Sequence, residues 1–285
     1  MTASGYISIT RPVNSLMIGL AVLVGEAVAI STVRLDLATA MGYLTGVLIT
    51  AFTMVINDML DFDVDRANGA KRPLVLGTAT MSGAKILSVA LLVAGLAASA
   101  YTGLSTLAIA GAFSVVATLY NWKLKERGFS GNVAVALSMM IPFIYGGVLV
   151  QGIRWSPVLD IMALTAFLAG LGREVIKGIV DVQGDALRNV RSLARQKGEG
   201  AAGAVGAAFF LAAVGSSLVP PILVRTSVFY DVVIGATDLL FVCLAVFVIR
   251  SNAKEDARRA KTLALLGMFT GMVGFILQGL FGGAY

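Results

Sequence analysis

Nine long apolar stretches set the strongest limit on how this chain can fold. A helix of about 20 apolar residues spans the hydrocarbon core of a bilayer. Hydrophobic residues make up 58% of the chain and charged residues only 13%, which is too little charge to cover a soluble domain of this size. The stretches are continuous, without the alternation of a membrane β-barrel. The sequence therefore predicts an all-α polytopic membrane protein with nine transmembrane helices, at roughly 13–31, 37–57, 81–99, 103–121, 132–151, 157–178, 201–223, 231–250 and 260–281.

Basic residues are divided unevenly between the two sides that nine spans would define. All but three of the 22 lysines and arginines fall on the side of the N-terminus, and the exceptions are Arg34, Arg154 and Arg225. By the positive-inside rule, the N-terminus and the large loops are predicted to be cytoplasmic in a multi-pass protein of the cell membrane. The net charge of +6 then follows from topology, and no nucleic-acid partner is needed to explain it.

Four aspartates follow the second apolar stretch, in the segment VINDMLDFDVD (55–65). At about 100° per helical residue, Asp58, Asp61 and Asp65 share one face with Asn57, while Asp63 points to the opposite side. Four acids so close to an apolar span need partners, since a charge is costly to bury alone. We therefore expect the shared face to carry the functional residues and Asp63 to have no role in the site.

The same spacing recurs 120 residues later, in EVIKGIVDVQGD (174–185). Asp181 and Asp185 repeat the interval from Asp61 to Asp65, and Glu174 and Lys177 lie on the same helical face. Four predicted spans separate the two motifs, so both are expected on one side of the membrane. Internal repeats of this kind are common in membrane bundles. We interpret residues 1–285 as one domain built from two four-helix units plus a ninth helix.

The residue types in both motifs favour a hard divalent cation. No histidine is present, and the single cysteine, Cys243, lies within a predicted span, so zinc-type ligands are not at hand. Carboxylate and amide oxygens suit Mg²⁺ or Ca²⁺, and Mg²⁺ is commonly held by one or two carboxylates together with substrate phosphates. Two such faces would bind a diphosphate through bridging ions. Solvated helix ends are the plainer alternative, but they leave the repeated spacing unexplained.

Cations that suit phosphate lie close to both motifs. RANGAKRP (66–73) follows Asp65 directly, and YNWKLKERG (120–128) follows the fourth predicted span. Cytoplasmic loops are basic whatever their function, so topology alone explains part of this pattern. A basic face at Arg188, Arg191, Arg195 and Lys197 suits anionic lipid headgroups as well as a substrate phosphate. The candidate substrate-binding residues are Arg11, Asn14, Arg66, Lys71, Arg72, Lys123, Lys125 and Lys177.

The segment NDMLDFDVDRANGAKRP resembles the first motif of the UbiA-type intramembrane prenyltransferases, and REVIKGIVDVQGD resembles their second. ITRPVNSLMIGLAVLVGEAVA and YNWKLKERGFSGNVAVA also look like that family, in particular like its archaeal geranylgeranylglyceryl-phosphate branch. The resemblance covers nearly the whole chain. One departure is Gly178, where many members carry an additional aspartate.

The resemblance implies nine helices around a central cavity that opens sideways to lipid, with Mg²⁺ on both motifs holding a prenyl diphosphate. It makes Arg66, Arg72, Lys123 and Lys125 the residues that neutralise the diphosphate, and it places Tyr120 near the reactive carbon. The implied metal ligands are Asn57, Asp58, Asp61, Asp65, Asp181 and Asp185, and the implied catalytic residues are Asp61, Asp181, Tyr120 and Lys123.

The resemblance further implies transfer of a geranylgeranyl group to the hydroxyl of geranylgeranylglyceryl phosphate in archaeal ether-lipid synthesis. Arg11, Lys71 and the basic face at 188–197 would supply the cations that this phosphorylated acceptor needs. An aromatic acceptor such as 4-hydroxybenzoate is the alternative. A cation transporter fits less well, because the aspartates lie at span ends beside phosphate-binding cations. Membrane lipids are the expected surroundings, and no obligate protein partner is indicated.

Overall fold

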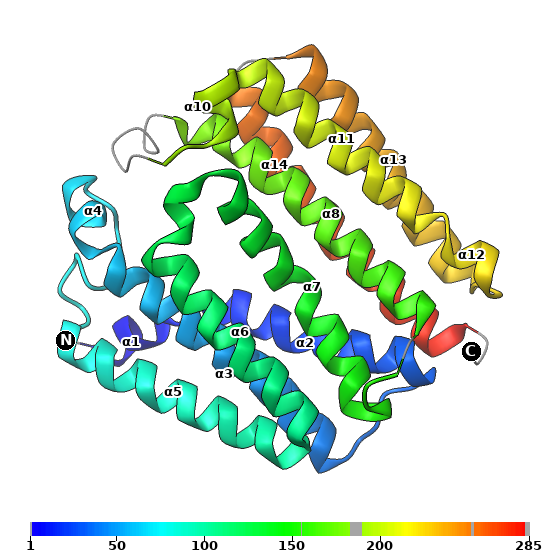
Figure 1. Ribbon diagram of the computed structural model, residues 1–285, viewed down its shortest axis with the longest axis horizontal. Coiled ribbons are helices and arrows are strands. Elements are labelled where there is room, and N and C mark those ends of the chain that lie inside the picture. The colour runs from blue at the N-terminus through cyan, green and yellow to red at the C-terminus, as the bar shows by residue number, and fades with distance from the viewer. Residues whose placement is uncertain (1, 155, 183–189, 252–253, 283–285) are drawn as a thin grey trace. The chain divides into compact units, whose positions relative to one another are not determined.

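The computed structural model describes residues 2–154, 156–182, 190–251 and 254–282, and every regular element in these ranges is a helix (Figure 1). Two short helices, α1 and α4, and the short elements η1, α10 and α12 connect nine long helices. The elements are α1 (Ala3–Ile9), α2 (Pro12–Ile30), α3 (Leu37–Leu60), α4 (Phe62–Ala67), α5 (Met81–Thr102), α6 (Leu104–Trp122), η1 (Leu124–Arg127), α7 (Phe129–Gln151), α8 (Pro157–Val180), α10 (Leu193–Lys197), α11 (Glu199–Ser217), α12 (Pro220–Leu223), α13 (Val228–Arg250) and α14 (Lys254–Phe281).

Eight of the described helices are long and apolar enough to cross a membrane, which fits a multi-pass membrane protein. They are α2, α3, α5, α6, α7, α11 continued by α12, α13 and α14. The ninth long helix, α8, has 24 residues but carries Asp160, Arg173, Glu174 and Lys177. The count of nine spans therefore remains a prediction for α8, because four charged residues make its passage through lipid costly without partners.

Several helix bounds differ from the apolar stretches. The last helix, α14, begins at Lys254 rather than near residue 260. Its first turns are charged, so a search for apolar stretches does not include them. The stretch at 201–223 divides into α11 and α12, and α12 begins at Pro220. Proline has no N–H to donate and is tolerated in the first turn of a helix, so it marks this restart.

The contacts within the chain divide it into two compact units. Unit 1 comprises Met1–Leu23 and Arg34–Lys123, and unit 2 comprises Val24–Val33 and Leu124–Tyr285. The boundary at Lys123 falls after the fourth predicted span, so four spans precede it and five follow. Helix α2 belongs to both units, since its residues up to Leu23 group with the first and the rest with the second.

Unit 1 is built on α3. The Asp36 side chain accepts a hydrogen bond of 2.8 Å from the Thr39 N–H and so caps the start of this helix. That bond lowers the pKa of the Asp36 carboxyl. Helix α5 packs along α3, where Gly95 lies against Ile49, and α6 packs against both (Figure 1). Small residues at such crossings let membrane helices approach closely.

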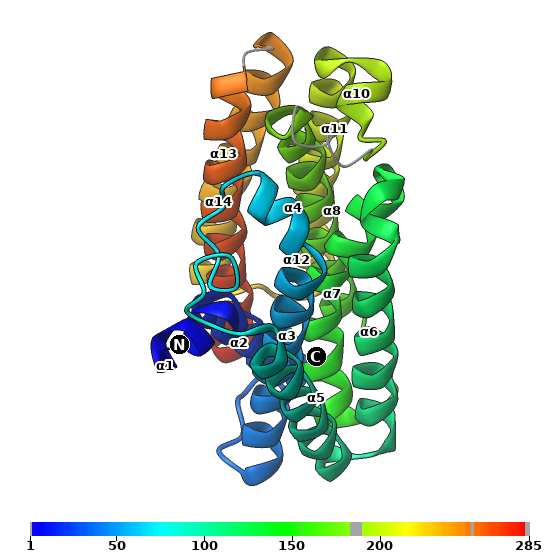
Figure 2. The same ribbon diagram turned by 90° about the vertical axis from the view of Figure 1, so that its left-hand side faces the viewer.

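Unit 2 has its core around α8, α11, α13 and α14, and α13 runs beside α14 (Figure 2). The ring of Phe210 is fully buried and packs against Gly172 of α8 and Phe241 of α13. Gly206 of α11 contacts Ile176 of α8 in the same way, so bulky side chains of one helix occupy space left by glycines of the other. This arrangement packs the second half of α8 closely against α11.

Helices α3 and α8 carry the two aspartate motifs and match each other closely. Both have 24 residues, and their bounds differ by the same interval of 120 residues as the motifs. Asp61 ends α3 with φ −90° and ψ 2°, and Asp181 ends α8 with φ −95° and ψ 6°. Both residues thus lie in the bridge region of backbone space, which active-site residues frequently occupy.

The close approach of α2 to α7 within unit 2 generates a stability prediction. A Cβ added at Gly25 would overlap the backbone carbonyl oxygen of Phe143, which cannot turn aside. We expect Gly25→Ala to destabilise the protein by about 1–3 kcal/mol, the usual cost of overpacking. Gly235→Ala on α13 is the matched control, because no atom lies within 4 Å of the added Cβ. Thermal unfolding in detergent compares the two, and an equal melting temperature would contradict this packing.

Candidate functional site

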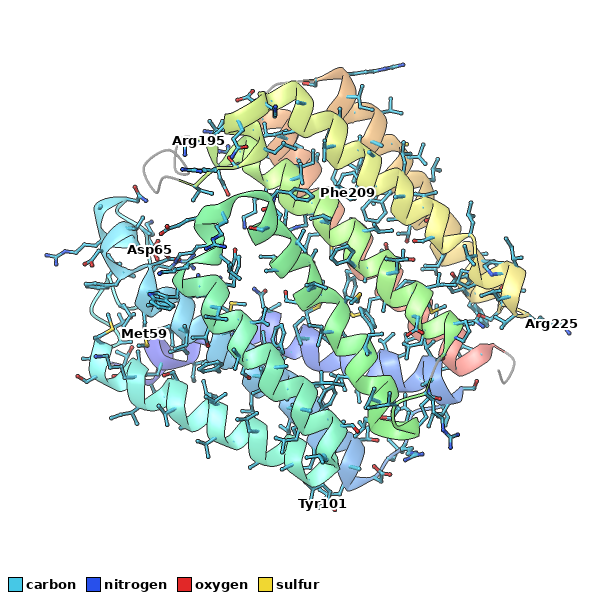
Figure 3. The ribbon with its side chains drawn as sticks, viewed as in Figure 1. Met59, Asp65, Tyr101, Arg195, Phe209 and Arg225 are labelled. Carbon is cyan, nitrogen blue, oxygen red and sulfur yellow. The ribbon has the colours of Figure 1, made fainter. Side chains whose placement is uncertain are left out.

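The aspartates after α3 differ sharply in burial. Asp58, Asp61 and Asp65 are only 2%, 7% and 7% exposed, whereas Asp63 is exposed. The helix breaks at Asp61, but the hydrogen-bond pattern continues through the break, since the Asp61 N–H donates to Asn57 O and the Asp65 N–H to Asp61 O. The one-sided arrangement expected from helical spacing therefore survives into α4. Figure 3 labels Asp65 there.

Arg11 neutralises Asp58. Its Nη2 atom lies 2.6 Å from Asp58 Oδ1 and also donates to Asn57 Oδ1 at 3.2 Å. This pairing places an opposite charge against the buried carboxylate and so offsets the cost of burying it. The expected substrate-binding Arg11 is thus held, in this structure, by two of the expected metal ligands.

The backbone at Arg11 is strained. Its φ is +46°, a left-handed conformation that costs a non-glycine residue on the order of 1–3 kcal/mol. The chain is held on both sides of this position, because the Arg11 N–H donates to Ser8 O and the Arg11 carbonyl accepts from the Ser15 N–H. The Ser15 hydroxyl donates to Thr10 O at 2.8 Å. The link between α1 and α2 therefore aims the arginine side chain at the end of α3.

Asn57 connects three segments of unit 1. Its Nδ2 donates to Asp61 Oδ2 at 3.0 Å and to Asn121 Oδ1 at 2.8 Å, while its Oδ1 accepts from Arg11. Asn121 is buried near the end of α6 and donates in turn to Ala117 O. Asn57 thereby orients one carboxylate and joins α3 to α6.

Asp65 faces the loop that follows α4. Arg72 Nε lies 3.6 Å from Asp65 Oδ2. Helix α1 holds the far part of this loop, since the Thr2 N–H donates to Thr78 O and the Tyr6 hydroxyl lies 3.1 Å from the Thr80 hydroxyl. Each of the three buried aspartates therefore has its own partner: Arg11 for Asp58, Asn57 for Asp61 and Arg72 for Asp65.

The other expected phosphate-binding residues of unit 1 are more open. Arg66, Lys71 and Asn14 are exposed, and neither Arg66 nor Lys71 forms any of the ion pairs described above. Lys123 is exposed and lies over the Trp122 ring, with its Nζ 4.7 Å from the ring centroid. This cation–π contact holds the ammonium group at the end of α6. Tyr120 and Lys125 are half-buried.

In unit 2, α8 carries a buried acid between two cations. Glu174 is 5% exposed and accepts from Arg173 Nη1 at 2.7 Å and from Lys177 Nζ at 3.0 Å. Asp181 lies half-buried one turn after Lys177, and its N–H donates to Lys177 O. Asp185 and Arg188 lie outside the described residues. Arg191, Arg195 and Lys197 flank or form α10, and Arg195 is labelled there in Figure 3.

The donor chemistry of the first motif fits a hard metal ion, but its present contacts do not assemble one. Carboxylate and amide oxygens of Asn57, Asp58, Asp61 and Asp65 are the ligands that Mg²⁺ prefers. Within the described ranges, however, no three Asp or Glu side chains converge closely enough to hold an ion. The reason lies in the partners, because each carboxylate turns toward a different arginine or amide.

Neither Asn121 nor the pair of Glu174 and Arg173 is among the site residues expected from the sequence. Asn121 is adjacent to the expected Tyr120, yet only the crossing of α3 and α6 shows that it contacts Asn57. Helical spacing already places Glu174 on the face of Lys177 and Asp181, but its pairing with Arg173 is visible only in the structure.

Comparison with known proteins matches residues 17–273 to the UbiA prenyltransferase family. Among curated relatives, digeranylgeranylglyceryl phosphate synthase of Archaeoglobus fulgidus is 38% identical over 92% of this chain and 90% of its own. The enzyme of the same name from Thermococcus kodakarensis is 32% identical over 98% and 99%.

Solved structures show the same fold. One from work on digeranylgeranylglyceryl phosphate synthase in membranes has a TM-score of 0.82 and 26% identity, covering 97% of this chain and 98% of its own. A UbiA homolog from Archaeoglobus fulgidus bound to GPP and Mg²⁺ has a TM-score of 0.68 at 18% identity, with 95% and 99% covered. Because the family match spans most of the 285 residues, this chain belongs to the UbiA prenyltransferase family and is a prenyltransferase.

Proposed function

We propose that this chain transfers a geranylgeranyl group from its diphosphate to the free hydroxyl of geranylgeranylglyceryl phosphate. The C–O bond to the diphosphate breaks, an ether bond to the glycerol oxygen forms, and the hydroxyl proton is lost. The observation that carries the proposal is the buried face of Asp58, Asp61 and Asp65 flanked by Arg11 and Arg72. The curated relatives named digeranylgeranylglyceryl phosphate synthase support the choice of acceptor.

The proposal assigns Mg²⁺ to both aspartate motifs. Bound there, the metal would supply positive charge to the diphosphate oxygens and so make the diphosphate a better leaving group. The residues that would hold it are Asn57, Asp58, Asp61 and Asp65 in the first motif, and Asp181 and Asp185 in the second. The oxygen-only donor set of the first motif supports this assignment, as does Mg²⁺ in the homolog bound to GPP.

Cations of the chain bind the diphosphate in this proposal. Arg66 and Arg72 follow the first motif directly, and Lys123 and Lys125 follow α6. Preorganised cations stabilise charge that develops as the bond breaks, without reorganising at that moment. The Trp122 ring supports such a role for Lys123, because it restricts where the ammonium group can lie. Tyr120 is proposed to face the reactive carbon, and Lys177 to contribute beside the second motif.

The acceptor carries a phosphate of its own, and its recognition needs further cations. Lys71 is exposed in the loop before Arg72, and Arg191, Arg195 and Lys197 lie around α10. We assign the acceptor phosphate to this set together with Asn14, which is exposed at the start of α2. An aromatic acceptor such as 4-hydroxybenzoate lacks a phosphate and would leave these cations without a ligand.

The proposal includes nine membrane spans, with α8 as the ninth, and a cytoplasmic N-terminus. The pairing of Glu174 with Arg173 and Lys177 supports a membrane position for α8, because paired charges cost less to bury than single ones. The basic loops after α4 and α6 support the cytoplasmic orientation.

The choice of acceptor can be tested directly with purified protein. Incubation with Mg²⁺ and geranylgeranyl diphosphate should prenylate geranylgeranylglyceryl phosphate and leave 4-hydroxybenzoate unchanged, as identified by mass spectrometry. Addition of EDTA should stop the reaction, and restoring Mg²⁺ should recover it. Prenylation of 4-hydroxybenzoate alone would replace the proposed acceptor with an aromatic one.

The two motifs can be tested by isosteric substitution. Asp61→Asn and Asp181→Asn should each lower kcat by about 100-fold or more, since a neutral amide cannot replace a charged metal ligand. Asp63→Asn is the matched control and should retain activity, because this side chain is exposed on the opposite side of α4. Circular dichroism and melting temperature should show that all three variants fold. Activity in both motif variants comparable to the control would rule out the two-motif assignment.

A further inference from the structure

The Arg11 guanidinium occupies the oxygens that a metal ion would need. One nitrogen, Nη2, contacts both Asp58 Oδ1 at 2.6 Å and Asn57 Oδ1 at 3.2 Å. Mg²⁺ binds oxygen at about 2.0–2.1 Å. A dication on these same oxygens would stand beside a guanidinium at nearly contact distance, and the two positive charges would repel each other. Arg11 and the metal therefore compete for Asn57 and Asp58.

We propose that Arg11 is an exchangeable counter-ion. When metal and diphosphate bind together, its guanidinium moves from Asp58 to the diphosphate. This inference rests on the proposed function, because it needs both ligands at the first motif. It makes Arg11 a positioning residue that links the two binding events. Metal alone must displace the arginine without offering it a new partner, whereas diphosphate supplies that partner.

The arginine is only partly satisfied where it lies. Its Nε is buried and has no hydrogen-bond partner. A guanidinium presents five donors, and Asp58 and Asn57 are contacted through a single nitrogen rather than through the two-pronged pairing that arginine forms best with carboxylates. A diphosphate offers several acceptor oxygens, so the exchange would satisfy donors that the present position leaves unused.

The main chain around Arg11 is anchored, which confines the movement to the side chain. The Arg11 N–H and carbonyl are hydrogen-bonded to Ser8 and Ser15, and α1 is tied to the loop before α5 through Thr2 and Tyr6. The guanidinium is 26% exposed at the side chain, whereas Asp58 is 2% exposed. The carboxylate is therefore the fixed partner and the arginine the movable one.

Thermodynamic linkage predicts how metal and diphosphate affect each other's binding. If Arg11 opposes metal alone and joins the diphosphate, each ligand strengthens the binding of the other by the same factor. Removing the guanidinium should then strengthen the binding of metal alone and weaken the coupling. A residue that merely supports the shape of the site would act in the opposite direction, because its loss would weaken metal binding.

The backbone provides a suitable variant. At φ +46°, glycine fits position 11 without strain, so Arg11→Gly removes the guanidinium and relieves the backbone together. Arg11→Lys retains a cation, and Arg225→Gly, in the exposed segment between α12 and α13, is the matched control. The probes are Mn²⁺, followed by electron paramagnetic resonance, and inorganic diphosphate.

We expect Arg11→Gly to bind Mn²⁺ alone about tenfold more tightly than wild type, within the range usual for coupled sites, and to show a smaller effect of diphosphate. Arg11→Lys and Arg225→Gly should stay close to wild type. Weaker or unchanged Mn²⁺ binding by Arg11→Gly overturns the exchange. If wild-type protein binds neither Mn²⁺ nor diphosphate, the proposed function fails as well.

Wild-type protein provides an independent measurement should Arg11→Gly not fold. In protein labelled with ¹⁵N-arginine, the Nε–H resonance of Arg11 is assigned by its loss in Arg11→Lys. It should move when Mg²⁺ and inorganic diphosphate are added together, and move less with Mg²⁺ alone. A resonance that stays in place with both ligands would show that Arg11 remains on Asp58, and the exchange would be wrong.

Discussion

Burial of three carboxylates at the end of an apolar helix is the constraint on which the first half of this protein depends. Each acid is nearly inaccessible to water, and an isolated charge in such a place is prohibitively costly. The chain meets this cost with a separate partner for each one: Arg11, Asn57 and Arg72. Those partners come from the link after α1, from α3 itself and from the loop after α4, so the acids hold together segments that are distant in sequence.

The same partners suit the ligand of the proposed function. A diphosphate with its metal ions brings both signs of charge, and a site of acids alone or cations alone would repel one of them. In the first motif, Arg11 lies against Asp58 and Arg72 against Asp65, so both signs of charge are present. In the second, Glu174 is paired with Arg173 and Lys177 two turns before Asp181. The strained backbone at Arg11 belongs to this arrangement, because strain of this kind persists only where surrounding contacts impose it.

Much of this was predictable from the sequence, and particular residues show why. Helical spacing alone separated Asp63 from the other three aspartates, because a helix assigns each residue to a face. The repeat in α3 and α8 was visible because 120 residues separate both the motifs and the helix bounds. The role of Asn121 was not predictable, since its contact with Asn57 depends on how α6 crosses α3. The start of α14 was also missed, because its first turns are charged.

The sequence by itself determined the membrane class, the helix-bearing segments and the two aspartate motifs, since hydrophobic length and helical periodicity are local properties of the chain. Only the tertiary structure decided which group each acid meets. Arg11 precedes Asp58 by 47 positions, and no local rule relates them; the hydrogen bonds around Ser8 and Ser15 bring them to 2.6 Å. Pairing between distant residues depends on helix packing, so the proposed exchange of Arg11 could be inferred only from the tertiary structure.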